Sequence, residues 1–245
     1  MSESHPERTD SAELTADEML ARVLYRDGLM LVIDKPAGMP VHRGPKGGAN
    51  LESSFDFLRY GLPRPPVLAH RLDRDTSGCL VLGRHRKATA SLGLLFKHGR
   101  ISKTYWAVVE GGPVEDQGTI DLPLGRLNAE RGWWQKVDPE GQKAVTNWTV
   151  RGRGDGLTWM ALEPVTGRTH QLRVHCAAMG WPIVGDNIYG SGPRFGEPTL
   201  HLHAREIVIP LSRNKPPVVV TAPVPPHLRQ RLMVCGWTQD SEEAT

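Results

Sequence analysis

The sequence has few cysteines and none of the spacings by which cysteine and histidine usually bind metal. Its three cysteines, Cys79, Cys176 and Cys235, are far apart, and no Cys-x-x-Cys pair occurs. Three widely spaced thiols provide no disulfide framework and fit a reducing cytosol. Histidines are more frequent, but no His-Glu-x-x-His motif is present. We therefore expect no metal site, and interpret the histidines as ordinary core or surface residues.

Long apolar runs and a strong excess of charge are also absent. No stretch is long enough to span a bilayer, and the N-terminus lacks a signal pattern. We therefore expect a cytoplasmic protein with no membrane partner. The formal net charge is +3 in 245 residues, which does not by itself demand a nucleic-acid partner. Hydrophobic residues make up 39% of the chain, as in a globular protein with a real core.

The two ends of the chain differ in composition from its middle. Residues 1–22 are polar and acid-rich, which predicts a disordered leader with at most a short helix near residues 16–21. Residues 237–245 form an acidic stretch that we expect to be a flexible tail. The sequence thus predicts one folded domain over residues 23–236.

Within that domain, short β-like runs outnumber helical patterns. Two apolar runs across Asp27-Gly28 predict a hairpin. Helices are expected at residues 50–58 and 85–97, the second ending at Gly99, and after Thr166 or Thr169 as a capping residue. Frequent short strands with few long helices predict an α+β fold with a largely antiparallel, mixed sheet.

One polar loop lies between two apolar runs in the first third of the chain. Residues 70–78 read His-Arg-Leu-Asp-Arg-Asp-Thr-Ser-Gly, and loops held between strands often position reactive groups. Arginines close to Asp73 can pair with its carboxylate and orient it. The simpler interpretation is a solvated turn in which Asp75 caps its own backbone.

Taken whole, this loop resembles the signature motif of the RluA-type pseudouridine synthases, which convert uridine in RNA to its C-glycoside isomer. The resemblance extends to the Lys35-Pro36 loop, the Lys103-Thr104-Tyr105 triplet and residues 163–175. It implies a sheet split around a central catalytic cleft that contains Asp73. Lys35 and Pro36 are expected to shape the site rather than to react.

The resemblance also implies roles for individual residues. Asp73 would be the catalytic carboxylate, either attacking C1′ or removing a sugar proton, and the sequence leaves both open. Arg173 would pair with Asp73. Tyr105 would pack on the uracil, and its phenol would assist removal of the C5 proton. Arg71 would occupy the stack vacated by a flipped uridine. The other expected substrate contacts are Leu202, Arg74 and Arg168.

No redox step occurs in this isomerisation, so the resemblance implies no cofactor and no bound nucleotide. The expected partner of the monomer is RNA, either ribosomal or transfer RNA. An alternative is a catalytically inactive RNA-binding or RNA-chaperone protein on the same fold. That alternative would require loss of Asp73, Tyr105 or Arg173, and all three are present. Trp133 and Trp134 either stack on RNA bases or cover the core.

Overall fold

The computed structural model describes residues 13–44, 47–128, 133–194, 196–212 and 214–239. The strands are β1 (Val23–Arg26), β2 (Met30–Lys35), β3 (Val67–Leu68), β4 (Ser77–Gly83), β5 (Ser102–Glu110), β6 (Gln117–Asp121), β7 (Leu124–Arg126), β8 (Gln135–Val137), β9 (Val145–Gly154), β10 (Leu157–Pro164), β11 (Leu202–Ile209) and β12 (Val218–Thr221). The helices are α1 (Ala16–Ala21), the 3-10 helix η1 (Leu51–Leu58), α2 (Arg86–Lys97), α3 (Gln171–Ala178) and α4 (Pro226–Val234).

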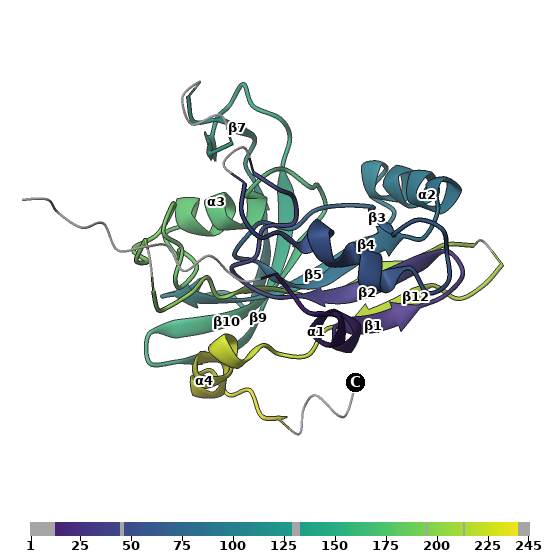
Figure 1. The fold of residues 1–245 in the computed structure, drawn as a ribbon. Coiled ribbons are helices and arrows are strands. Elements are labelled where there is room, and N and C mark those ends of the chain that lie inside the picture. Colours follow the sequence, from purple (N-terminus) through teal and green to yellow (C-terminus); the bar gives the residue numbers. More distant parts are fainter. Residues whose placement is uncertain (1–12, 45–46, 129–132, 195, 213, 240–245) are drawn as a thin grey trace, which may run out of the picture.

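A single large sheet runs through the molecule (Figure 1). Its order is β1-β2-β4-β11-β5-β10-β9-β6, with β12 beside β11 and β3 beside β4. Among the described strands of this sheet, β4 and β11 form the one parallel pair. The predicted α+β fold with a largely antiparallel, mixed sheet is therefore confirmed.

The parallel pair joins two halves of the sheet over a short distance. Only His203 with Ser77 and Ala204 with Gly78 are in register. The Ser77 hydroxyl and His203 Nδ1 are 2.9 Å apart, which adds a side-chain hydrogen bond to the junction. Gly78 has φ of +103°, and a Cβ there would collide with the backbone of Ala204. Glycine is thus required where the halves meet.

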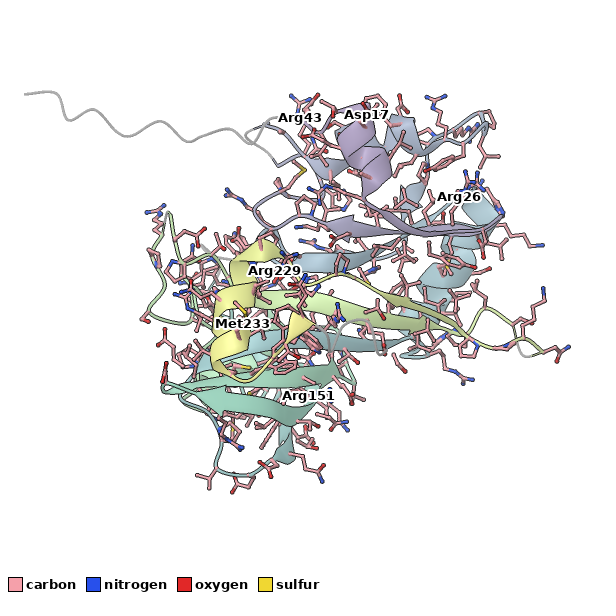
Figure 2. All side chains as sticks on the ribbon, turned by 90° about the horizontal axis from the view of Figure 1, so that it is seen from below. Asp17, Arg26, Arg43, Arg151, Arg229 and Met233 are labelled. Carbon is pink, nitrogen blue, oxygen red and sulfur yellow. The ribbon has the colours of Figure 1, made fainter. Side chains whose placement is uncertain are left out.

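The sheet carries helices on both faces. In Figure 1, α2 and α3 lie above the sheet and α4 below it; Figure 2, seen from below, shows α4 with Arg229 and Met233 across the strands. Successive side chains of a strand point to opposite faces of the sheet, so β5 packs against helices on both faces. Ala107 packs in the cluster that contains α3 residues, whereas Val108 packs in the cluster that contains Leu228 of α4.

Both ends of the folded domain extend beyond the predicted limits. Thr15 and Glu18 form a reciprocal capping box at the start of α1, and Met19 is fully buried in the core. At the other end, Trp237 is buried against α4. The folded domain therefore begins before residue 23 and ends after residue 236, because single apolar side chains anchor these polar segments. The rest of the expected leader and tail, residues 1–12 and 240–245, lies outside the described residues.

Two helix predictions are confirmed and one helix start is wrong. Asn50 caps η1, and His85 caps α2, which is followed by Gly99 with φ of +62°. Helix α3, however, is preceded by His170 as N-cap, not by a threonine. The Thr166 hydroxyl is used elsewhere, because it donates to Gln171 Oε1 and accepts from the Val145 N–H. In the described part of the chain, no helix has the length and apolar character of a membrane span.

Candidate active site

An open cleft of about 1010 Å³ lies on the face of the sheet that carries α2 and α3. The residues that line it come from the loop before β4, the C-terminal end of α2, strands β5, β9 and β11, and residues 163–173. The predicted residues that line it are Arg71, Asp73, Tyr105, Arg168, Arg173 and Leu202. Side chains that are distant in sequence thus converge on one cavity.

A buried lysine holds the loop that carries Asp73. The Lys35 ammonium donates to the carbonyl oxygens of Pro36, Arg74 and Thr76, each at 2.8 Å. Burial lowers the pKa of Lys35 to about 7, but three carbonyl acceptors match the three N–H bonds of an ammonium group. We infer that Lys35 is charged and fixes the loop on both sides of Asp73. Lys35 thus contributes to the shape of the loop, and its lack of a part in the reaction stays a prediction.

His70 anchors the start of the same loop. Its ring stacks on Phe96 of α2 at a centroid distance of 4.3 Å. Its Nε2 accepts a hydrogen bond from the Val81 N–H at 3.0 Å. Burial lowers the pKa of His70 to about 3, so the ring is neutral. This histidine is structural, which agrees with its interpretation from the sequence.

Arg173 lies near Asp73, but its principal partner is another carboxylate. The nearest approach to Asp73 joins Nη1 and Oδ2 at 3.9 Å. Asp186, in contrast, accepts from Arg173 Nε at 2.8 Å and from Nη2 at 2.7 Å. Burial lowers the pKa of Arg173, but the hydrogen bonds and charge of Asp186 outweigh burial and leave that pKa raised. Arg173 is therefore a permanent cation held in a fixed position.

Asp186 was not singled out from the sequence as a site residue. It is almost fully buried, and its Oδ1 also accepts from the N–H groups of Ile188 and Tyr189. Burial alone would raise the pKa of Asp186, but Arg173 and these donors lower it overall. The carboxylate is therefore ionised, and it ties α3 to the loop after Gly185.

His170 is a second residue that sequence reasoning passed over. Its Nε2 lies 3.7 Å from Asp73 Oδ2, and its Nδ1 lies 2.8 Å from the hydroxyl oxygen of Tyr189. Trp133 meets the same ring edge-on at 5.4 Å. Trp133 is 57% exposed, so it borders the site rather than filling the core. Stacking of Trp133 on RNA bases stays a prediction.

Tyr105 and Leu202 form part of the apolar wall. They come from neighbouring strands, β5 and β11, whose pairing is antiparallel. Burial, followed by the charge of Asp73, raises the pKa of Tyr105 well above its ordinary value. Its phenol is therefore protonated at neutral pH. A protonated phenol suits packing against a base better than removing a proton from it.

The three predicted arginine contacts lie in different surroundings. Arg71 is exposed and lines the cleft. Arg168 also lines it, and its Nε donates to the Lys143 carbonyl at 3.0 Å. Arg74 does not line the cleft. Its Nε donates to Gly38 O at 2.9 Å and its guanidinium lies 3.7 Å from Asp75, so the geometry gives no support for the expected substrate contact.

Two further cations reach the cleft. Lys97 and Lys103 are both among its lining residues. Burial lowers the pKa of Lys103, so a bound anion would stabilise its charged form. Across the described residues, no group of three or more histidine, cysteine, aspartate or glutamate side chains is placed to hold a metal ion.

Comparison with known proteins identifies the family. A family model described as RNA pseudouridylate synthase matches residues 29–178, which contain Asp73, Tyr105 and Arg173. The chain belongs to the RNA pseudouridylate synthase family. It is thus a pseudouridine synthase of the RluA type, an isomerase, as the motifs predicted.

Relatives and solved structures agree with this assignment. The chain is 43% identical over 208 residues to an uncharacterized RNA pseudouridine synthase of Zymomonas mobilis, covering 83% of this chain and 94% of the relative. It is 32% identical over 210 residues to the ribosomal large subunit pseudouridine synthase C of Buchnera aphidicola, covering 82% and 66%. Human RNA pseudouridylate synthase domain containing 4 has a TM-score of 0.75 at 26% identity, covering 90% of this chain and 95% of that one.

Proposed function

We propose that this synthase isomerises specific uridines in ribosomal or transfer RNA, using Asp73 as its reactive carboxylate. The observation that carries the proposal is the convergence of Asp73, Tyr105 and Arg173 in one open cleft. The Asp73 side chain is 24% exposed, so a substrate can reach it. The same convergence argues against the inactive RNA-binding or chaperone alternative, because that function needs no such arrangement.

The reaction exchanges one bond at the sugar for another. The N1–C1′ bond breaks, the uracil turns, C5 bonds to C1′, and the proton on C5 is lost while N1 gains one. Positive charge develops at the sugar when the glycosidic bond breaks, and a carboxylate beside it stabilises that charge or attacks C1′. Asp73 as a base toward a sugar proton is the other route, and the geometry supports both.

The positions of the apolar side chains and of Arg173 suggest their roles in the reaction. Leu202 and Tyr105 would sandwich and orient the uracil during its rotation. Arg173 would keep a positive charge beside Asp73 throughout the reaction, since Asp186 fixes it in place. Because the Tyr105 phenol is protonated at neutral pH, we assign it a packing role in preference to removal of the C5 proton.

RNA would be held by the cations around the cleft. Arg71, Lys97, Lys103 and Arg168 all line it and would contact phosphates or bases. A uridine inside a helix must leave its stack to reach Asp73. Exposed Arg71, two residues before Asp73, would fill the vacated position. The name of the Buchnera relative favours ribosomal RNA as the first substrate to test. Monomeric action in the cytoplasm remains a prediction from the sequence.

Transcriptome-wide mapping of pseudouridine tests the proposal. RNA from cells lacking this protein should lose modification at one or a few defined uridines in ribosomal or transfer RNA. Expression of the wild-type protein should restore those sites, and Asp73→Asn should not. Maps that are identical with and without the protein would contradict the proposal.

A further inference from the structure

His170 lies nearer to the reactive carboxylate than Arg173 does. Its Nε2 is 3.7 Å from Asp73 Oδ2, compared with 3.9 Å for Arg173 Nη1. Both nitrogens approach the same oxygen. His170 is buried, so the imidazole is shielded from bulk water, whereas the Asp73 side chain is partly exposed to the cleft.

The backbone at His170 is unusual for its position. As N-cap of α3 it has φ of +53° and ψ of +17°, the left-handed conformation, and it makes no side-chain capping hydrogen bond. An N-cap side chain ordinarily accepts from a helix N–H. Here the imidazole is turned away from the helix toward Asp73, and the left-handed backbone is strained for a residue other than glycine. Such strain is concentrated at functional sites.

The hydrogen bonds of Tyr189 determine which ring nitrogen carries the proton. The Tyr189 hydroxyl oxygen accepts from the Gln135 N–H at 2.9 Å and lies 2.8 Å from His170 Nδ1. Among the described residues, no other acceptor for its single proton is recorded. The hydroxyl therefore donates to Nδ1, which leaves the proton on Nε2, facing Asp73. The opposite tautomer would aim a lone pair at the carboxylate.

We propose that His170 is a positioning residue that directs an Nε2–H donor at Asp73 Oδ2, with Tyr189 selecting the tautomer. The proposal rests on the proposed function of Asp73. Burial lowers the pKa of His170 despite the opposing charge of Asp73, so the ring is neutral at pH 7. It therefore orients the carboxylate without adding a second full charge next to Arg173.

Two N–H groups lie near Asp73 Oδ2, at 3.7 and 3.9 Å, which is beyond hydrogen-bond distance but close enough for both to attract the same carboxylate oxygen. Arg173 alone approaches Oδ2 at the limit of ion-pair distance and is bound mainly to Asp186. With His170 added, Oδ2 is attracted from two directions, and a small movement of Asp73 toward His170 would form the hydrogen bond that orients the carboxylate. A reactive group displaced by about 1 Å can lose on the order of 100-fold in rate, so orientation of this kind matters for turnover.

Nitrogen NMR of ¹⁵N-histidine-labelled full-length protein tests the tautomer without requiring activity. The His170 signals are assigned by their disappearance in His170→Gln. We expect a neutral ring with protonated Nε2 and unprotonated Nδ1 at pH 7. In Tyr189→Phe, protonated Nδ1 should become populated, because the hydroxyl donor is gone. A wild-type ring with its proton on Nδ1 would overturn the inference.

Two substitutions separate the donor from the backbone conformation. Asparagine enters the left-handed region readily but is too short to place a donor at the position of Nε2. Glutamine places its amide nitrogen close to that position. We expect His170→Asn to lower kcat about 10- to 100-fold with KM for RNA almost unchanged. His170→Gln should restore most of kcat. A kcat of His170→Asn equal to or above that of His170→Gln would overturn the inference.

The two proposals fail in different ways. Absence of pseudouridine formation by the wild-type protein on every RNA tested would contradict the proposed function and leave the tautomer measurement valid. A second outcome would reject the role of His170 and leave the proposed function intact. In that outcome the wild-type protein is active and Asp73→Asn is not, but the His170 proton lies on Nδ1, or His170→Asn is at least as active as His170→Gln. Where one of the two His170 variants fails to fold, the other assigns the His170 signals, and the tautomer of the wild-type ring decides.

Discussion

Arg173 is bound by Asp186 through two hydrogen bonds of 2.7 and 2.8 Å, whereas its nearest approach to Asp73 is 3.9 Å, close to the limit for an ion pair. The cation of the site is thus part of a buried ion pair that exists before substrate arrives. Asp186 keeps Arg173 charged and in place, so Asp73 retains an oxygen that is free to act on the sugar.

Asp186→Asn should destabilise the protein strongly. It leaves the buried Arg173 guanidinium without its counter-charge, and breaking a buried pair costs about 3–5 kcal/mol. The free energy of unfolding is measured in urea. Asp116→Asn is the matched control, because Asp116 and Arg153 form an exposed pair at 2.8 Å that contributes at most about 1 kcal/mol. Equal effects of the two substitutions would show that the buried pair is not important.

Lys35→Met should destabilise the loop that carries Asp73. Methionine keeps an unbranched chain of similar size but leaves three carbonyl oxygens without their donor. Each unsatisfied buried group costs about 1–3 kcal/mol, so three of them correspond to a total loss of roughly 3–9 kcal/mol. Lys136→Met, at an exposed pair with Asp138, should change stability by less than about 0.5 kcal/mol. A stable Lys35→Met protein would contradict the assignment of Lys35 as the anchor of the loop.

Asp34→Asn should stabilise the protein at pH 8 but not below pH 4. Burial, only partly offset by Arg22 and Lys35, raises the pKa of Asp34 from 3.8 to about 6. The folded state therefore binds this proton more tightly than the unfolded chain, and stability from this group falls as pH rises through 6. At pH 8 the substitution should therefore raise the free energy of unfolding by at most about 3 kcal/mol. Unfolding at both pH values measures the difference, and a pH-independent difference would contradict the assigned pKa.

Arg71→Ala should slow turnover on structured RNA more than on a flexible strand. Its side chain is exposed at the cleft, where it would fill the place of a flipped uridine. In an unstructured strand no base stack has to be filled, so the rate on that substrate should fall less. Single-turnover rates on a hairpin and on a matched single strand test this. Equal loss on both substrates would assign Arg71 to phosphate binding instead.

The sequence was sufficient to predict the fold class and the convergence of Asp73, Tyr105 and Arg173. The convergence followed from the resemblance of three motifs to those of the family, whereas the fold class also followed from short β-like runs and from turn signals such as Asp27-Gly28. Asp186 and His170 were missed for physical reasons. An aspartate after Gly185 is typical of a turn, and only the approach of α3 makes it a counter-ion. His170 stands beside threonines that are better capping residues, so its left-handed conformation has no local signal.

Arg74 and the domain limits were predicted less well, for a related reason. The family resemblance led us to expect a substrate contact from each arginine in the loop. In the structure Arg74 turns to the carbonyl of Gly38, a residue 36 positions earlier. Met19 likewise lies in a largely polar segment beside Leu20, and only the tertiary structure shows that Met19 is fully buried while Leu20 is exposed.

The most direct test of the central claim is pseudouridine formation by purified protein on a defined RNA target, with EDTA present and RNA folding controlled. The wild-type protein should form pseudouridine, and Asp73→Asn should form none while binding RNA with nearly unchanged, salt-sensitive affinity. Asparagine preserves the shape of the side chain and removes only its negative charge. Full activity of Asp73→Asn would contradict the account of a carboxylate mechanism.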